Sequence, residues 1–184
     1  MFHRATSALI LVDYQTRLLP RIHGGLSVVD EALFLAELTS LLDIPIFGTE
    51  QNPEGLGPND QQIRNYCNHT LLKHSFDATA SGLLECIQTV SPHIHQLVLA
   101  GCETHVCLMQ TALGLSEKGF EVAVIPQACG SRSSSDKALA IDRMQQLGIS
   151  ILSTEMIIFE WLQTSNHPRF KSILQLIKNR ASKD

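Results

Sequence analysis

Three ionisable side chains stand at the ends of short apolar runs in this sequence, and together they could carry out nucleophilic acyl transfer. Asp13 follows one such run, Lys73 ends a second, and Cys107 comes shortly after a third. A cysteine thiolate attacks carbonyl carbons, and a nearby carboxylate can take the thiol proton and later deliver it to the leaving group. A lysine ammonium stabilises both anions. The sequence therefore predicts a nucleophile at Cys107, a general base at Asp13 and a fixed positive charge at Lys73.

The elements around these residues explain how they could meet. Short apolar runs predict buried strands, and apolar residues at helical spacing predict helices. The two alternate with short connections, which predicts an α/β fold: a three-layer α-β-α sandwich with a doubly wound, mostly parallel, Rossmann-like sheet. Ligands bind where the carboxyl ends of such strands converge. We expect strands at 8–12, 44–49, 70–73, 96–100, 121–125 and 149–152, and helices at 27–42, 79–90, 104–118, 134–147, 154–163 and 168–180.

The helix beginnings carry further expectations. Ser27, Thr79 and Thr104 are predicted N-caps, because their hydroxyls can accept hydrogen bonds from first-turn amides. The proline- and glycine-rich segment 50–58 is predicted to be an irregular loop. A helix N-terminus favours anions, so Cys107 is expected to be a thiolate with a lowered pKa.

Composition limits the class of protein. The length of 184 residues predicts a single domain over 1–184, and 44% hydrophobic residues are enough for a substantial core. A net charge of −4 gives no reason to expect a nucleic-acid partner. The apolar runs are too short to span a membrane, and residues 1–4 precede a predicted strand without a signal-peptide pattern. Five cysteines without a C-x-x-C pair favour reduced thiols, so we expect a cytoplasmic or organelle-matrix setting.

Several motifs together resemble those of the isochorismatase-like cysteine hydrolase superfamily, over residues 8 to about 163. The core motifs are LVDYQ at 11–15, KHSF at 73–76 and AGCETHVC at 100–107, supported by SRS at 131–133 and STEM at 153–156. Two further segments look specifically like the isochorismatase domain-containing branch. They are TEQNPEGLG at 49–57 and HPRFK at 167–171.

The resemblance implies the same three catalytic residues, Asp13, Lys73 and Cys107, and a hydrolase that forms an acyl-enzyme on cysteine. It also implies a cis peptide bond between Cys102 and Glu103. That bond would turn the Glu103 backbone N–H toward the site, where it would form an oxyanion hole with the Cys107 backbone N–H.

Other residues receive less specific roles. We expect Tyr14, Gln51 and Phe76 to line the pocket for a small-molecule substrate. His105 lies two residues before Cys107 and is expected to point away from the site. Cys102 is also expected to be structural.

No metal and no cofactor are expected. Nicotinamidase-like members of the superfamily use an Asp/His cluster after the second strand, whereas residues 49–53 here contain no histidine.

Two alternatives to a hydrolase stay open at this stage. One is a non-catalytic binding or scaffold protein that retains the fold. The other is a thiol redox protein, in which Cys102 would resolve oxidised Cys107.

The resemblance favours a homo-oligomer, a dimer or a higher assembly. The terminal helices also carry more apolar residues than one sheet face needs. These residues are Phe159, Trp161, Leu162, Phe170, Ile173, Leu174 and Ile177.

Overall fold

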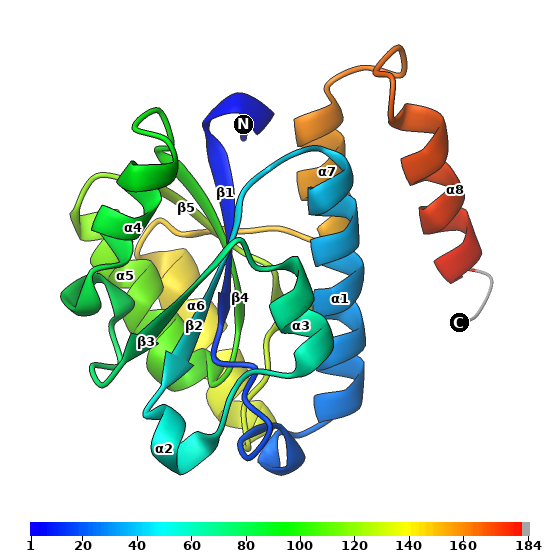
Figure 1. Cartoon of the computed structure of the whole chain (residues 1–184). Helices are drawn as coiled ribbons and strands as arrows, with labels where there is room; N and C mark the ends of the chain where they lie inside the picture. The colour runs from blue at the N-terminus through cyan, green and yellow to red at the C-terminus, as the bar shows by residue number, and fades with distance from the viewer. Residues whose placement is uncertain (182–184) are drawn as a thin grey trace.

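The strands form one six-stranded parallel sheet in the order β3-β2-β1-β4-β5-β6, within a computed structural model that describes residues 1–181 (Figure 1). The order reverses direction between β1 and β4, which makes the sheet doubly wound and confirms the predicted α/β class. The strands are β1 Ser7–Val12, β2 Ile46–Gln51, β3 His69–Lys73, β4 Gln96–Gly101, β5 Glu121–Val124 and β6 Ser150–Ile151.

Helices cover both faces of the sheet, which gives the predicted three layers (Figure 1). One layer holds α1 Gly25–Leu41, α7 Thr154–Leu162 and α8 Phe170–Ala181. The other layer holds α4 Leu83–Val90, α5 Met109–Glu117 and α6 Ser134–Gln146. Short helices connect these elements: α2 Pro53–Leu56, α3 Gln61–Tyr66, and the single turns Arg4–Thr6, Leu19–Arg21, Ala78–Ser81, Thr104–Leu108 and Pro126–Ala128.

The sheet separates two hydrophobic cores, and alternation along β1 assigns its side chains to them. Leu9 and Leu11 face the core beneath α1, whereas Ile10 and Val12 face the core beneath α4 and α5. All of them are fully buried, as expected for a central parallel strand whose apolar run is continuous.

The local predictions at the helix starts were less accurate. Helix α1 begins at Gly25 with Gly24 at its N-cap, so Ser27 lies inside the helix. Thr79 is not a cap either, because the Asp77 carboxylate accepts from its backbone N–H. The segment 50–58 is not wholly irregular, since it contains α2.

The terminal apolar residues are mostly core residues of this chain. Trp161 and Ile173 are fully buried or nearly so, and Leu162 and Ile177 also belong to the core beneath α1. Phe159 remains 40% exposed. The apolar character of these residues is therefore explained largely by the packing of α7 and α8 within one chain, and it does not support an oligomer.

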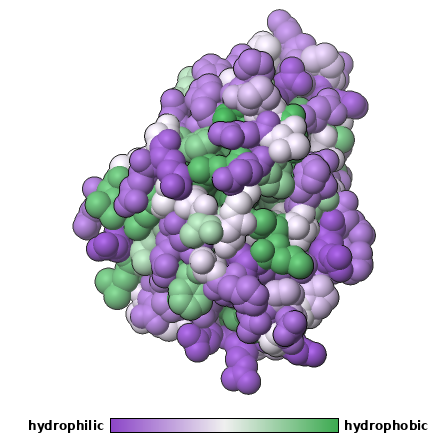
Figure 2. All heavy atoms as spheres, turned by 60° about the vertical axis from the view of Figure 1, so that its left-hand side comes forward, coloured by the Kyte–Doolittle hydropathy of each residue, from purple (hydrophilic) through white to green (hydrophobic). Residues whose placement is uncertain are grey.

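The outer surface is mixed in character. Figure 2 shows hydrophobic side chains in separate patches between hydrophilic ones on the face that carries β3 and α4. Leu72 on β3 and Phe76 just beyond it are among the exposed large hydrophobic residues. Among the helices of residues 1–181, none is long and apolar enough to cross a membrane.

Candidate active site

The carboxyl ends of four neighbouring strands, β3, β2, β1 and β4, lie side by side and build the site. Val12 at the end of β1 pairs with Thr49 on one side and with Gly101 on the other. A side chain at Gly101 would place its Cβ 2.2 Å from the Val12 carbonyl oxygen. Only glycine therefore lets the end of β4 approach β1 so closely, and this approach brings the segment after β4 alongside Asp13.

Asp13 and Lys73 form a buried ion pair at this edge. The Lys73 Nζ lies 2.7 Å from the Asp13 Oδ2, and neither side chain has any exposed surface. The other Asp13 oxygen accepts from the Thr49 hydroxyl at 2.6 Å. Buried charges are costly unless they are paired and hydrogen-bonded, and in this arrangement each group compensates the charge of the other.

Lys73 has two further acceptors. Its Nζ donates to the Gln51 Oε1 at 2.7 Å and, at 3.5 Å, to the carbonyl of Phe76. The three N–H groups of the ammonium thus face a carboxylate, an amide and a backbone carbonyl. This geometry fixes the position of the positive charge.

Cys107 lies within the π-helical turn Thr104–Leu108 and is nearly buried. Its Sγ is 3.9 Å from the Gln51 Oε1. Burial, which is the largest cause, and the neighbouring Asp13 together raise the pKa of the Cys107 thiol to about 12, because Lys73 lowers this pKa by less than Asp13 raises it. The expectation of a lowered pKa was therefore wrong, because desolvation outweighs the helix N-terminus.

Two buried residues support the site and were missed by the sequence reasoning. Thr49 orients Asp13 through the hydrogen bond described above. Gln15 exchanges two hydrogen bonds with the backbone of Gln51: its Nε2 donates to the carbonyl, and its Oε1 accepts from the N–H, both at 2.9 Å. The pairing of β1 with β2 was the available signal, because it sets Val12 opposite Thr49 and so brings the residues after β1 to the end of β2.

The segment before Cys107 is held by the loop that follows β5. The peptide bond between Cys102 and Glu103 is cis. The Glu103 carboxylate accepts from the backbone N–H and the Nε of Arg132, at 2.9 and 3.0 Å. The Thr104 hydroxyl donates to the carbonyl of Gly130, so Thr104 anchors the two segments and does not cap a helix.

Three other residues with expected roles fall outside the immediate cluster or at its margin. Tyr14 is fully buried beneath α1, and its hydroxyl donates to the carbonyl of Ala128, so it is not available to line a pocket. Phe76 is half exposed, and its carbonyl is tied to Lys73. The His105 Nδ1 lies 3.0 Å from the Ser131 hydroxyl.

The two cysteines of the AGCETHVC motif lie in different cores. Cys102 packs into the core beneath α1, whereas Cys107 packs into the core beneath α4 and α5. Burial also raises the pKa of the Cys102 thiol well above its usual range. Their placement in different cores argues against the redox alternative, in which Cys102 would resolve Cys107.

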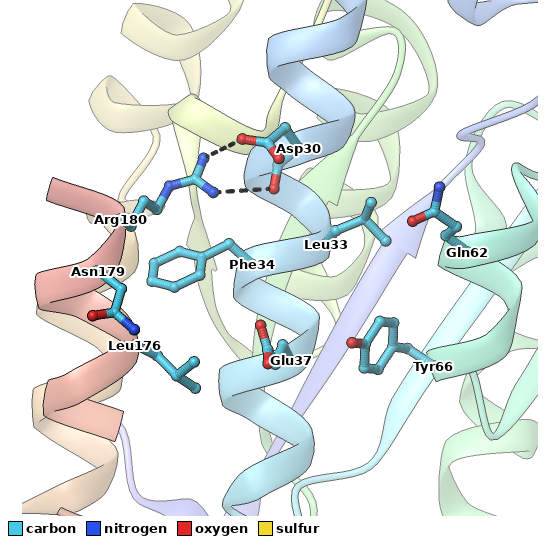
Figure 3. A pocket seen from close by; sticks show the side chains of 9 residues that line it. All are labelled: Asp30, Leu33, Phe34, Glu37, Gln62, Tyr66, Leu176, Asn179 and Arg180. Atoms are coloured by element: carbon cyan, nitrogen blue, oxygen red, sulfur yellow. Dashed lines mark hydrogen bonds and ion pairs between the residues drawn. The ribbon is translucent and has the colours of Figure 1, made fainter. Parts of the chain in front are cut away.

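A surface cavity of about 470 Å³ lies away from this cluster, between α1, α3 and α8 (Figure 3). Arg180 crosses from α8 to Asp30 on α1 at 2.9 Å, and its guanidinium lies 4.6 Å from the centre of the Phe34 ring. Asp13, Lys73 and Cys107 are not among the residues that line this cavity. Across residues 1–181, no group of three or more His, Cys, Asp or Glu side chains is arranged to hold a metal ion.

Comparison with known proteins identifies relatives of the whole chain. Residues 7–156 match the model of the isochorismatase domain. Isochorismatase domain-containing protein 2 of Xenopus laevis is 33% identical over 176 residues, which cover 96% of this chain and 85% of the relative. Isochorismatase family protein 1B of Dictyostelium discoideum is 32% identical, with 95% of this chain and 87% of the relative covered.

Solved structures share the same architecture. A structure described as MAR1 ribonuclease from Caenorhabditis elegans has a TM-score of 0.87 and 28% identity, covering 96% of this chain and 91% of its own. The Escherichia coli YcaC gene product, described as an octameric hydrolase of unknown specificity, has a TM-score of 0.80 and 22% identity. The match covers all of this chain and 97% of the bacterial one.

Proposed function

Since the chain belongs to the isochorismatase family, we propose that it is a cysteine hydrolase that cleaves an amide, or a related C–N or ether bond, in a small molecule. The observation that carries this proposal is the cluster of Asp13, Lys73 and Cys107 at one sheet edge. These residues come from three separate segments, and the cluster buries an ion pair beside a thiol.

In the proposed first step, the substrate carbonyl binds against Cys107. The thiol proton passes to Asp13 as the sulfur forms a bond to the carbonyl carbon. Because the raised pKa keeps the free thiol protonated, deprotonation belongs to this step and does not precede substrate binding. The backbone N–H groups of Glu103 and Cys107 would stabilise the oxyanion.

The second half of the reaction reuses the same carboxylate. The tetrahedral intermediate collapses, the C–N bond breaks, and Asp13 returns its proton to the departing amine. Asp13 then takes a proton from water as the water oxygen attacks the thioester carbon. The C–S bond breaks, the acid product leaves, and Asp13 returns its proton to the sulfur, which restores the Cys107 thiol. Lys73 keeps its charge throughout and compensates the negative charge in the site.

The test is a comparison of wild type with Cys107→Ala on a panel of small amides, carbamoyl compounds and isochorismate. Cys86→Ala is the matched control, because Cys86 is a partly exposed thiol on α4, outside the cluster. We expect turnover in wild type and control only, and a mass increase on the peptide that contains Cys107 during turnover. Equal turnover by all three proteins would contradict the role of Cys107 as the nucleophile.

The panel also includes RNA, because one structural neighbour is described as a ribonuclease. The net charge of −4 and the pI near 6 do not favour a polyanionic substrate for this chain. We expect no RNA cleavage that depends on Cys107.

We also propose that the chain forms a homo-oligomer. An octameric neighbour of the same fold supports this proposal, as do the exposed Leu72 and Phe76 on and beyond the edge strand β3. Light scattering at several protein concentrations tests it, and a monomer at every concentration would contradict it.

A further inference from the structure

The side-chain amide of Gln51 is held in one orientation at the centre of the site. Its Oε1 accepts from Lys73 at 2.7 Å, and its Nε2 donates to the carbonyl of His74 at 2.6 Å. A carbonyl can only accept and an ammonium can only donate, so a flipped amide would lose both bonds. The oxygen of Gln51 must therefore face Lys73.

The same oxygen also faces the thiol. It lies 3.9 Å from the Cys107 Sγ, so one neutral acceptor stands next to both the ammonium and the sulfur. An acceptor in this place favours the S–H form and disfavours a negative sulfur. It also occupies an N–H group of Lys73 that could otherwise pair with a thiolate.

Gln15 makes this arrangement rigid from behind. It is fully buried, and besides its two bonds to the Gln51 backbone its Nε2 donates to the Gly57 carbonyl at 2.6 Å. The buried amide of Gln15 thus fixes the end of β2, while the side chain of Gln51 remains directed at the charged pair.

We propose that Gln51 is a positioning residue that keeps Lys73 on Asp13 and holds Cys107 in its thiol form, with Gln15 fixing the Gln51 backbone. This inference rests on the proposed function, in which Cys107 is the nucleophile. It gives Gln51 a role different from the expected lining of the substrate pocket, because both polar ends of its amide are already engaged within the protein. The Gln51 Oε1, which accepts from Lys73, thereby sets how readily the Cys107 sulfur loses its proton.

The proposal predicts opposite effects of two substitutions on the alkylation of Cys107 by iodoacetamide in the full chain. Gln51→Glu has nearly the same shape but adds negative charge beside the sulfur, so alkylation should slow. Gln51→Met removes the acceptor and frees Lys73 to pair with the thiolate, so alkylation should accelerate. A shift of one pKa unit changes the thiolate fraction about tenfold, and the accompanying change in nucleophilicity leaves a net effect of about threefold on the rate.

The rate is measured at pH 8 by mass spectrometry of the peptide that contains Cys107. The partly exposed Cys86 provides an internal reference, and Gln175→Met on the exposed face of α8 is the matched control. A change in the access of iodoacetamide to Cys107 would not explain slower alkylation in Gln51→Glu, because glutamate and glutamine have nearly the same shape. An alkylation rate of Gln51→Glu within about twofold of the wild-type rate would overturn the inference, even if Gln51→Met fails to fold. If both variants fold, a change of the rate in the same direction in both would also overturn it.

Two further variants separate this inference from the proposed function. Lys73→Met should slow alkylation of Cys107, and Asp13→Asn should accelerate it, because each removes one of the charges that act on the sulfur. If neither variant changes the rate, the proposed joint action of Asp13, Lys73 and Cys107 is refuted. If both behave as expected but the Gln51 variants do not, only the role of Gln51 is refuted.

Discussion

The buried pair of Asp13 and Lys73 makes a quantitative prediction about stability. Lys73→Met removes the ammonium but keeps an unbranched side chain of similar length. Asp13→Asn removes the carboxylate charge but keeps the oxygen that accepts from Thr49. Asparagine also tolerates the left-handed backbone at this position, where φ is 53°.

Each single substitution leaves one charge in a site with no exposed surface. The two charged groups lie 2.7 Å apart with 0% side-chain exposure, so the surviving charge has no water to replace its partner. Breaking such a pair costs about 3–5 kcal/mol, whereas replacing both partners by neutral groups is often close to neutral. The double variant should therefore be more stable than either single variant, with a coupling energy of about 3 kcal/mol or more.

Urea denaturation of wild type, both single variants and the double variant measures this coupling. The control is the same cycle on Arg180 and Asp30, whose contact is 2.9 Å but whose side chains are 28% and 70% exposed. Exposed pairs couple by about 0–1 kcal/mol. If the Asp13–Lys73 cycle gave a coupling no larger than this control, a buried ion pair could not be the organising element of the site.

Three other predictions follow from single contacts. Gly101→Ala should destabilise the protein by about 1–3 kcal/mol or more, because its Cβ would meet the Val12 carbonyl oxygen at 2.2 Å; Gly119→Ala has open space and should cost less, as thermal unfolding of both will show. Tyr14→Phe leaves the buried carbonyl of Ala128 without its donor and should cost about 1–3 kcal/mol in urea denaturation; no change in stability would contradict that bond. Burial raises the pKa of the Cys129 thiol from 9.0 to about 12, so with rising pH the unfolded chain loses this proton before the folded chain does. The free energy of unfolding should therefore hold below about pH 9 and fall between about pH 9 and pH 12. Denaturation at a series of pH values should show that Cys129→Ala reduces this slope by about 1.36 kcal/mol per pH unit.

The layered α/β fold could be predicted because its signals are local. Continuous apolar runs such as 8–12 are typical of strands buried on both faces, and segments with helical spacing between such runs predict helices that connect parallel strands. The same reasoning identified Asp13, Lys73 and Cys107, since parallel strands end at a common edge. Local sequence was a poorer guide to helix starts, because Gly24 begins α1 through its backbone conformation and Ser27 is not needed.

What surrounds each ionisable group was decided only by the tertiary structure. The sequence places Cys107 near a helix start, which by itself lowers a thiol pKa. The packing of the sheet edge, however, buries the sulfur beside Asp13 and so raises the pKa of the Cys107 thiol. The sequence likewise places Tyr14 next to Asp13, but alternation about the end of β1 sends the two side chains into different surroundings. Residue types and their order in the chain therefore determined which groups could react. Desolvation and the distances between groups far apart in sequence determined their protonation, because both depend on atoms that only the folded chain brings together.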